Sequence, residues 1–307
     1  MIAYSVIIPV YKTTAHLPVL VQAIRDVFLK LNRSFEVILV NDNPDYPNHL
    51  VIDPLLTAYP GQLHCITLTR NYGQHNAIIC GFGKASGEFV ITMDDDGQHR
   101  PEDIPVLIEQ QATANYDVVY GKYETRRHSL LRNFSSSAIK LLCKIGIPDL
   151  HPDYTSFRLI RTGIAKEMLS MNNSYTFLDG YISWITTHVS SVNVKHLERQ
   201  EGVSNYTIGK LLSHGITILF TFSALPIRLV TYLSLLICSS AFTYALYVLI
   251  RKEVLNDFQQ GFPTMAIFLA FGMGLILLTL SIIGEYVFRV HLKTTRKPNF
   301  IIKNTQP

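Results

Sequence analysis

Residues 88–103 read EFVITMDDDGQHRPED, and this stretch decides the fold. Its apolar beginning is typical of a short strand that is buried on both faces. Asp94, Asp95 and Asp96 follow directly. Pro101 and the two acids after it predict a helix start, because proline fixes φ at the first position and acids favour the positive end of the helix dipole. Adjacent carboxylates repel one another, so the trio is either a solvated turn or a set of ligands for something positive.

The first 125 residues alternate unbroken apolar runs with helical patterns. This alternation predicts an α/β fold in which a mainly parallel sheet lies between layers of helices. Ligands bind beyond the carboxyl ends of the strands in such sheets, and polar residues follow three of the runs. The predicted strands are 4–10, 35–40, 63–69, 88–93 and 117–121, and the predicted helices are about 14–31, about 74–85 and one from Pro101. Residues 128–187 read as mainly helical, and 191–199 as a further strand.

Two runs, 229–250 and 262–284, hold no charged residue, and each exceeds the roughly 20 residues that cross a bilayer as a helix. We therefore expect two transmembrane helices; a pair of buried core helices is the alternative. No secretory signal opens the chain, and its last residues from Arg289 are basic without an acid. The positive-inside rule then places both the N-terminal domain and the C-terminal end in the cytoplasm.

The sequence thus predicts four parts: a cytoplasmic α/β domain (1–205), an interfacial amphipathic helix (206–227), a two-helix transmembrane region (228–290) and a basic cytoplasmic tail (291–307). An ordinary surface helix is the alternative for the second part. The net charge is +4, and the basic excess sits in the tail and in residues 122–144 without forming one long basic run, so the lipid bilayer is the expected partner and nucleic acid is not. The four cysteines have no metal-type spacing and are interpreted as reduced.

Two acids spaced i, i+2 beyond a strand end can both turn toward one cation. Carboxylate oxygens suit Mg²⁺ or Mn²⁺, and such an ion needs substrate phosphates to complete its shell. Asp94 and Asp96 are therefore the candidate metal ligands, and Gln98 offers a further oxygen. A solvated acidic turn remains the alternative, and the acids alone do not exclude it.

Four motifs occur in a characteristic order: VIIPVYK (6–12), VNDNP (40–44), TRNYGQHNAIICGF (69–82) and MDDDGQHRPED (93–103). With them the chain resembles family 2 glycosyltransferases of the GT-A fold. More narrowly, it is similar to the polyprenyl-phosphate glycosyltransferases, which include dolichol-phosphate mannose synthases, bactoprenol glucosyltransferases and the undecaprenyl-phosphate aminoarabinose transferase. HLERQEGVSNY (196–206) and GEYVFRVHLKTTRKPNF (284–300) extend the resemblance over nearly the whole chain.

The resemblance implies inverting, metal-dependent transfer of one sugar from a nucleotide sugar, with a UDP-sugar favoured, to undecaprenyl phosphate. It also implies a multi-pass protein of the bacterial inner membrane, a homotetramer, and a product used to modify a cell-surface glycan such as lipopolysaccharide. A GDP-sugar transferase of the dolichol-phosphate-mannose type is one alternative. A non-catalytic, membrane-anchored nucleotide-sugar-binding protein is another. A processive polysaccharide synthase would carry QxxRW, which this sequence lacks.

The resemblance also assigns residues. The metal ligands are Asp94, Asp96 and Gln98, and the donor-binding residues are Pro9, Tyr11, Asp42, Arg70, Asp95, Arg199 and Ser204. The residues that bind the acceptor phosphate are Lys122, Arg126 and Arg132. The catalytic residues are Asp94, Asp96, Asp153 and Arg158. Many relatives carry an aspartate, proposed as a base, where this chain has Ser156, and Asp153 lies three residues earlier. A lipid monophosphate is largely dianionic at pH 7, so it can attack without losing a proton.

Overall fold

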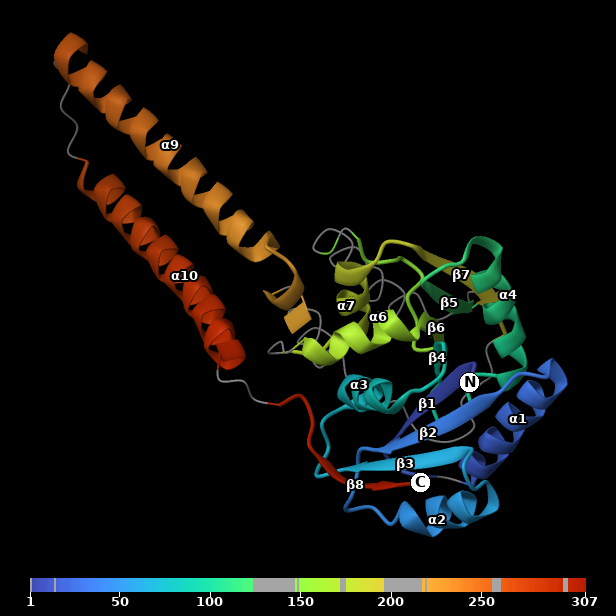
Figure 1. The fold of residues 1–307 in the computed structure, drawn as a ribbon. Coiled ribbons are helices and arrows are strands. Elements are labelled where there is room, and N and C mark those ends of the chain that lie inside the picture. The colour runs from blue at the N-terminus through green and yellow to red at the C-terminus, as the bar shows by residue number, and fades with distance from the viewer. Residues whose placement is uncertain are drawn as a thin grey trace.

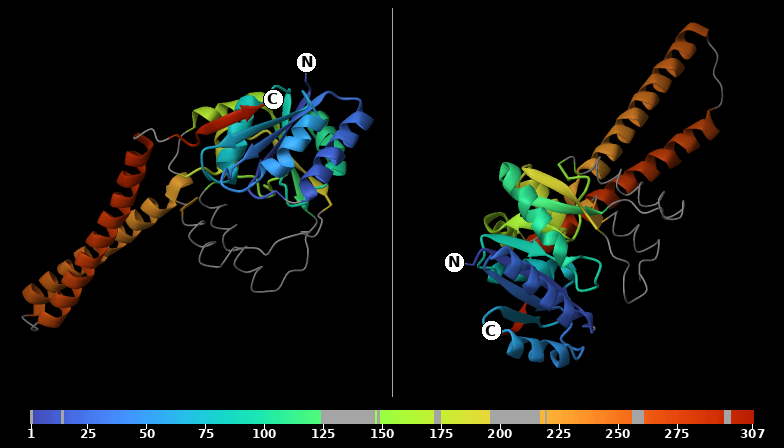
Figure 2. Two further views of the ribbon diagram at one scale, coloured as in Figure 1. Left: turned by 90° about the horizontal axis from the view of Figure 1, so that it is seen from below. Right: turned by 90° about the vertical axis from the view of Figure 1, so that its right-hand side faces the viewer.

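The computed structural model describes residues 2–13, 15–123, 147, 149–171, 175–195, 217–218, 220–255, 261–294 and 298–307. Within these residues a sheet domain with helices on both faces carries a pair of long helices that project away from it (Figures 1 and 2). Most of the predicted interfacial helix, 206–227, lies outside the described residues.

The described strands form one eight-stranded sheet in the order β7-β5-β6-β4-β1-β2-β3-β8. Strands β1, β2, β3 and β4 run parallel, β7 runs parallel to β5, and β6 and β8 are antiparallel to their neighbours. The strand bounds are β1 Tyr4–Val10, β2 Phe35–Asn41, β3 Leu63–Leu68, β4 Phe89–Thr92, β5 Val118–Tyr123, β6 Arg158–Arg161, β7 Val189–Val194 and β8 Ile302–Gln306. The predicted α/β fold with a mainly parallel sheet is confirmed.

Two hydrophobic cores lie on opposite faces of the sheet, because successive strand residues point to opposite sides. On β1, Val6 and Ile8 enter the core beneath α1, α2 and α4, whereas Ile7 enters the core beneath α3, α6 and α7. The helix bounds are α1 His16–Leu31, α2 His49–Ala58, α3 Gln74–Lys84, α4 Ile104–Ala114, α6 Thr162–Glu167 and α7 Leu178–Ile185, with short 3₁₀ turns at Pro101–Asp103 and Met168–Ser170. Burial on both faces explains why these strands read as unbroken apolar runs.

Two strands correct the sequence prediction. Residues 128–187 were expected to be mainly helical, but Arg158–Arg161 forms β6, which pairs antiparallel with both β4 and β5. The C-terminal residues were expected to be a basic tail, but Ile302–Gln306 forms β8 and pairs antiparallel with β3 at the edge of the sheet (Figure 1). Both strands are short, and only their partners in the sheet define them.

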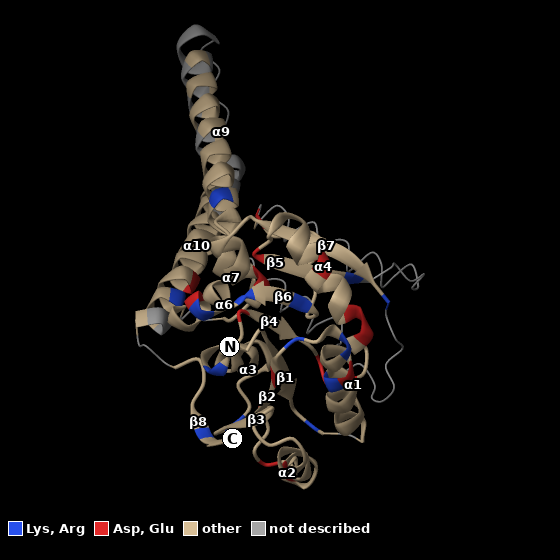
Figure 3. Cartoon of the chain, turned by 45° about the vertical axis from the view of Figure 1, so that its right-hand side comes forward, with Lys and Arg blue, Asp and Glu red and all other residues tan. Residues whose placement is uncertain are grey.

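The two long helices are α9 (Leu225–Leu255) and α10 (Phe262–Thr294). Among the described residues they contain two stretches long and apolar enough to cross a membrane, Leu225–Tyr244 and Phe271–His291. Along their described side chains, charged residues gather at the end nearest the sheet domain (Figure 3). Because β3 precedes this helical hairpin and β8 follows it in one sheet, both flanks of the hairpin lie on the same side of any bilayer that it crosses.

Candidate active site

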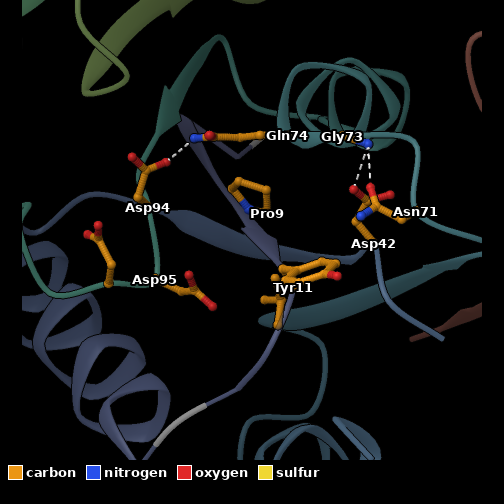
Figure 4. Close-up of a pocket in the computed structure, with 10 residues that line it drawn as sticks. Pro9, Tyr11, Asp42, Asn71, Gly73, Gln74, Asp94 and Asp95 are labelled. Carbon is orange, nitrogen blue, oxygen red and sulfur yellow. Dashed lines mark hydrogen bonds between the residues drawn. The ribbon is translucent and has the colours of Figure 1, made fainter. Parts of the chain in front are cut away.

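A cavity of about 340 Å³ opens beyond the carboxyl ends of β1, β2 and β4 (Figure 4). Parallel pairing creates it, because Val10 of β1 is in register with Asn41 of β2, and Ile7 of β1 with Thr92 of β4. The next residues of all three strands therefore meet at one edge of the sheet. The cavity is lined by Pro9, Val10, Tyr11, Asp42, Asn71, Gly73, Gln74, Asp94, Asp95 and Asp96.

Asp42 anchors one wall of the cavity. Its carboxylate accepts hydrogen bonds from the backbone N–H groups of Tyr72, at 2.7 Å, and Gly73, at 2.8 Å. Gly73 has φ +89°, a left-handed conformation that glycine adopts without strain, and its N–H also meets the side chain of Asn71. Burial raises the pKa of Asp42 above its ordinary value, and the two N–H groups limit that rise. Asp42 thus ties the loop after β3 to the end of β2.

The acidic trio forms the opposite wall. Asp94 accepts a hydrogen bond from the side-chain amide of Gln74, which also lines the cavity (Figure 4). Its other carboxylate oxygen accepts a hydrogen bond from the hydroxyl of Ser156, at 2.8 Å. Asp96 accepts the backbone N–H of Gln98, at 3.1 Å. Gly97 makes this tight turn possible with φ +75°, and an added Cβ there would lie 3.0 Å from the His16 ring.

The donor set of this wall suits a hard divalent cation, because three carboxylates line one cavity. Among the described residues, no group of three or more His, Cys, Asp or Glu side chains is arranged to hold a metal ion by itself. An ion at this wall would take its remaining ligands from a bound donor or from water.

The structure brings many of the predicted site residues together. Pro9, Tyr11, Asp42, Asp94, Asp95 and Asp96 all line the cavity. Gln98 and Arg70 do not line it. Gln98 contacts Asp96 through its backbone, and the guanidinium of Arg70 lies 4.8 Å from the ring centroid of Tyr72. Arg126, Arg132, Arg199 and Ser204 lie outside the described residues.

Arg158 requires a correction. It was expected among the catalytic residues, but its side chain is only 2% exposed and forms an ion pair with the buried Asp179 of α7. The hydroxyl of Tyr120 donates to the same carboxylate oxygen at 2.9 Å. Burial raises the pKa of Asp179, and the charge of Arg158 opposes that rise. Arg158 therefore joins β6 to α7 inside the core and does not line the cavity.

Lys122 and Asp153 form a second cluster, near the ends of β5 and β7. The ammonium of Lys122 lies 3.2 Å from Oδ2 of Asp153, and the hydroxyl of Ser191 donates to the same oxygen at 3.0 Å. Neither residue lines the cavity beside the acidic trio.

Gln74, Asn71, Gly73, Ser156 and His99 were not predicted as site residues. Gln74, Asn71 and Gly73 stand inside the quoted TRNYGQHN motif, and His99 inside DDDGQH. Motif membership was the available signal for these four. The only sequence signal for Ser156 was that many relatives carry an aspartate at its position. Its hydrogen bond to Asp94 depends on the pairing of β6 with β4, which the sequence did not predict.

Comparisons with known proteins agree with this geometry. The family model "Glycosyl transferase family 2" matches residues 5–169. The undecaprenyl-phosphate 4-deoxy-4-formamido-L-arabinose transferase of Pseudomonas aeruginosa strain PAO1 is 30% identical over 302 residues, which cover 97% of this chain and 89% of that protein. The bactoprenol glucosyl transferase of Shigella phage SfV is 28% identical over 302 residues, covering 98% of each.

Solved structures support the fold. The mannosyl-3-phosphoglycerate synthase of Rubrobacter xylanophilus superposes with a TM-score of 0.53 at 11% identity, over 70% of this chain and 73% of that one. The glucosyl-3-phosphoglycerate synthase of Mycobacterium tuberculosis, in complex with Mn²⁺ and UDP-glucose, gives a TM-score of 0.51 at 14% identity, over 71% and 77%. The predicted resemblance to polyprenyl-phosphate glycosyltransferases is confirmed, and this chain belongs to glycosyl transferase family 2 as a glycosyltransferase with a GT-A fold.

Proposed function

We propose that this protein transfers a single sugar from a nucleotide sugar to a polyprenyl phosphate at the surface of a membrane. The observation that carries the proposal is one arrangement: the strand-end carboxylates Asp42 and Asp94–Asp96 line a single cavity, in a domain whose sheet contains both flanks of an apolar helical hairpin. The cavity suits a phosphorylated, metal-bound donor, and the hairpin suits an acceptor that stays in the bilayer.

The relatives support the acceptor and, more weakly, the donor. The two quoted relatives align over nearly their whole length and are named for transfer involving undecaprenyl phosphate or bactoprenol. A UDP-sugar is our favoured donor, and a protein of the same fold has been crystallised with Mn²⁺ and UDP-glucose.

Asp94 and Asp96 would hold a Mg²⁺ or Mn²⁺ ion, and the placement of the two acids in one cavity fits that role. When bound, such an ion supplies positive charge to the leaving diphosphate. Pro9, Tyr11 and Asp42 would hold the nucleoside. Tyr11 is half exposed at the cavity wall, so its ring is accessible for stacking on a base. The acceptor phosphate, already ionised, would attack the anomeric carbon directly and invert it.

The expected site of action is the cytoplasmic face of a bacterial inner membrane. The lack of charged residues in the described parts of α9 and α10, away from the domain end, supports two crossings. The basic residues that follow α10 support a cytoplasmic domain by the positive-inside rule. The product would then be a lipid-linked sugar available for modifying a cell-surface glycan.

The test is a transfer assay with the full-length protein in detergent or nanodiscs. Mn²⁺, a panel of UDP- and GDP-sugars, and undecaprenyl phosphate are supplied, and nucleoside diphosphate release and lipid-linked sugar are both measured. We expect release that requires the lipid phosphate and the metal, and that is lost in Asp96→Ala. If acceptor-dependent release occurs with GDP-sugars and not with UDP-sugars, the donor is a GDP-sugar and the favoured UDP-sugar is wrong. Binding of donors without acceptor-dependent release would contradict it.

A further inference from the structure

Asp94 is held by side chains from three different parts of the fold. Gln74, at the first position of α3, donates to one carboxylate oxygen, and Ser156, just before β6, donates to the other at 2.8 Å. The backbone N–H of Asp94 donates to Nδ1 of His99, at 2.9 Å. Nε2 of His99 lies 3.3 Å from the hydroxyl of Ser156 and 3.8 Å from the Asp94 carboxylate. These contacts hold both the carboxylate and the backbone of Asp94.

The contacts fix the direction of each hydrogen bond. Nδ1 of His99 accepts the Asp94 N–H, so this nitrogen carries no proton and the ring proton lies on Nε2. Nε2 therefore donates toward the Ser156 oxygen, and the Ser156 hydroxyl donates to Asp94. This order is the reverse of a nucleophilic Ser-His pair, in which the histidine accepts the serine proton. Ser156 is thus placed as a donor to the Asp94 carboxylate, and His99 does not accept its proton.

The surroundings hold these two residues in place. His99 is 4% exposed, and its ring stacks on Phe157 with the ring centroids 5.2 Å apart. The backbone carbonyl of Ser156 accepts the hydroxyl of Thr92, at 2.6 Å. Thr92 is the last residue of β4 and pairs with Arg158 of β6, so the end of β4 and the beginning of β6 carry Asp94 and Ser156 together. The pairing of β4 with β6 therefore positions the hydrogen bonds that join His99, Ser156 and Asp94.

We propose that Ser156 and His99 are positioning residues that fix the Asp94 carboxylate for the divalent ion of the donor site, and that position 156 holds no catalytic base. The inference rests on the proposed function, because it deepens the role of the acidic trio. Side chains that hydrogen-bond to metal ligands orient them and tune their affinity for the ion. A neutral hydroxyl suits this place, since a carboxylate at position 156 would meet Asp94 with a like charge at hydrogen-bond distance.

The first test measures metal binding without catalysis. Full-length protein in nanodiscs is titrated with Mn²⁺ in the presence of UDP and without any lipid acceptor, and free Mn²⁺ is followed by electron paramagnetic resonance. We expect Ser156→Ala to weaken Mn²⁺ binding about tenfold or more, the effect typical of lost partners of metal ligands. Ser156→Thr keeps the hydroxyl and should bind within a few-fold of the unchanged protein. Equal Mn²⁺ affinity in Ser156→Ala and the unchanged protein would overturn the proposal.

The second test separates positioning from base catalysis. Ser156→Asp restores the residue type expected in many relatives. If position 156 were the seat of a base, this variant would equal or exceed the unchanged protein in kcat, and that result would overturn the proposal. We expect kcat below that of Ser156→Ala, because the new carboxylate replaces a donor and repels Asp94. His99→Asn, which keeps an acceptor near the Asp94 N–H but does not reach Ser156, should weaken Mn²⁺ binding less than Ser156→Ala.

Controls keep the two proposals apart. Ser170→Ala removes an exposed hydroxyl that donates to the backbone carbonyl of Glu167; neither residue lines the cavity, so Mn²⁺ affinity and kcat should stay unchanged. Thermal unfolding of each variant checks that the fold is intact. If the unchanged protein itself binds no Mn²⁺ with UDP, the metal role in the proposed function fails. If it binds Mn²⁺ and the Ser156 variants bind equally well, only the positioning role fails.

Discussion

The ammonium of Lys122 lies 3.2 Å from Oδ2 of Asp153, so the residue predicted to bind the acceptor phosphate is paired with a predicted catalytic acid. Burial alone would raise the pKa of Asp153, but hydrogen bonds from Ser191 and Lys122 and the positive charge of Lys122 outweigh it, and the pKa lies below its ordinary value. A carboxylate held ionised by an ammonium is a weak base. The pair is better suited to hold Lys122 in place until an anionic phosphate competes for it.

We expect Asp153→Asn to keep kcat within about tenfold, whereas loss of a general base costs about 10²–10⁴-fold. The acceptor KM should fall, because Lys122 loses its competing carboxylate. Lys122→Met is the matched variant and should raise the acceptor KM without changing the donor KM. Steady-state kinetics with varied lipid phosphate measure both. A loss above a hundredfold in Asp153→Asn at an unchanged acceptor KM would instead identify Asp153 as a base.

The lowered pKa of Asp153 also predicts how stability depends on pH. The folded pKa lies below the unfolded value of about 3.9, so the contribution of this carboxylate is fully present above that value. It is lost as the pH falls through the folded pKa. The free energies of unfolding in urea of the unchanged protein and of Asp153→Asn should therefore differ most above about pH 5 and converge in more acidic buffer. A difference that grows on acidification would contradict the assignment.

Asp42→Asn should weaken donor binding without unfolding the protein. One amide oxygen can replace one carboxylate oxygen, but the amide NH₂ would then face the N–H of Tyr72 or Gly73, and one of the two hydrogen bonds is lost. Hydrogen bonds to charged groups contribute about 1.5–3 kcal/mol each, so a shift of the loop after β3 should raise the UDP dissociation constant roughly 10- to 150-fold. Isothermal titration with UDP and Mn²⁺ measures it. Asp45→Asn is the control, because this exposed acid in the loop after β2 carries the same charge, and its loss should change UDP binding little.

The buried pair of Arg158 and Asp179 should matter for stability and little for chemistry. Removing one partner leaves an uncompensated buried charge, so Arg158→Met should lower the free energy of unfolding by about 3–5 kcal/mol. Because Arg158→Met combined with Asp179→Leu removes both charges, the double variant should recover much of that loss. Denaturant unfolding measures stability, and sugar transfer by the double variant should stay within about tenfold. A double variant that is folded but inactive would show that Arg158 has a catalytic role after all.

Trp184 provides a probe of the membrane boundary, because it is the only tryptophan of the chain. It is half exposed, and its ring centroid lies 4.7 Å from that of Phe222, three residues before α9 begins. Tryptophan favours the interface between lipid and water. In nanodiscs, lipids brominated near the carbonyl end of the acyl chain should quench its fluorescence more than lipids brominated deep in the chain. Quenching by neither lipid, or mainly by the deeper bromines, would contradict this placement.

Local patterns predicted the parts of the fold whose signal is local. The five apolar runs that became β1 to β5 are buried on both faces, and their order alone brought Asp42 and the acidic trio to one edge. The strand β6 was not predicted, because a four-residue run that begins and ends with arginine has no strand signal without its partners β4 and β5. For the same reason the motif resemblance could not distinguish a catalytic Arg158 from one that is paired with Asp179 on a distant helix.

The site prediction missed residues whose role depends on contacts across the fold. Gln74 and Ser156 reach Asp94 from positions 20 and 62 residues away in the sequence. Spacing along one strand identified the acidic trio, but it carries no information about what holds the trio in place. The strand β8 was missed too, since its exposed, polar sequence has no core pattern, and only β3 defines it.

Deleting residues 298–307 tests whether β8 supports the donor site. β8 pairs with β3, and the N–H of Thr69, where β3 leads into the loop that binds Asp42, donates to the carbonyl of Ile301 at 2.9 Å. Without these contacts β3 becomes an exposed sheet edge, and the loop loses a fixed end. We expect a lower unfolding temperature and a UDP dissociation constant raised several-fold, while membrane insertion is unchanged. Removing Pro307 alone, which lies beyond β8, is the control; equal UDP binding by both truncated proteins would show that the donor site does not depend on the returning strand.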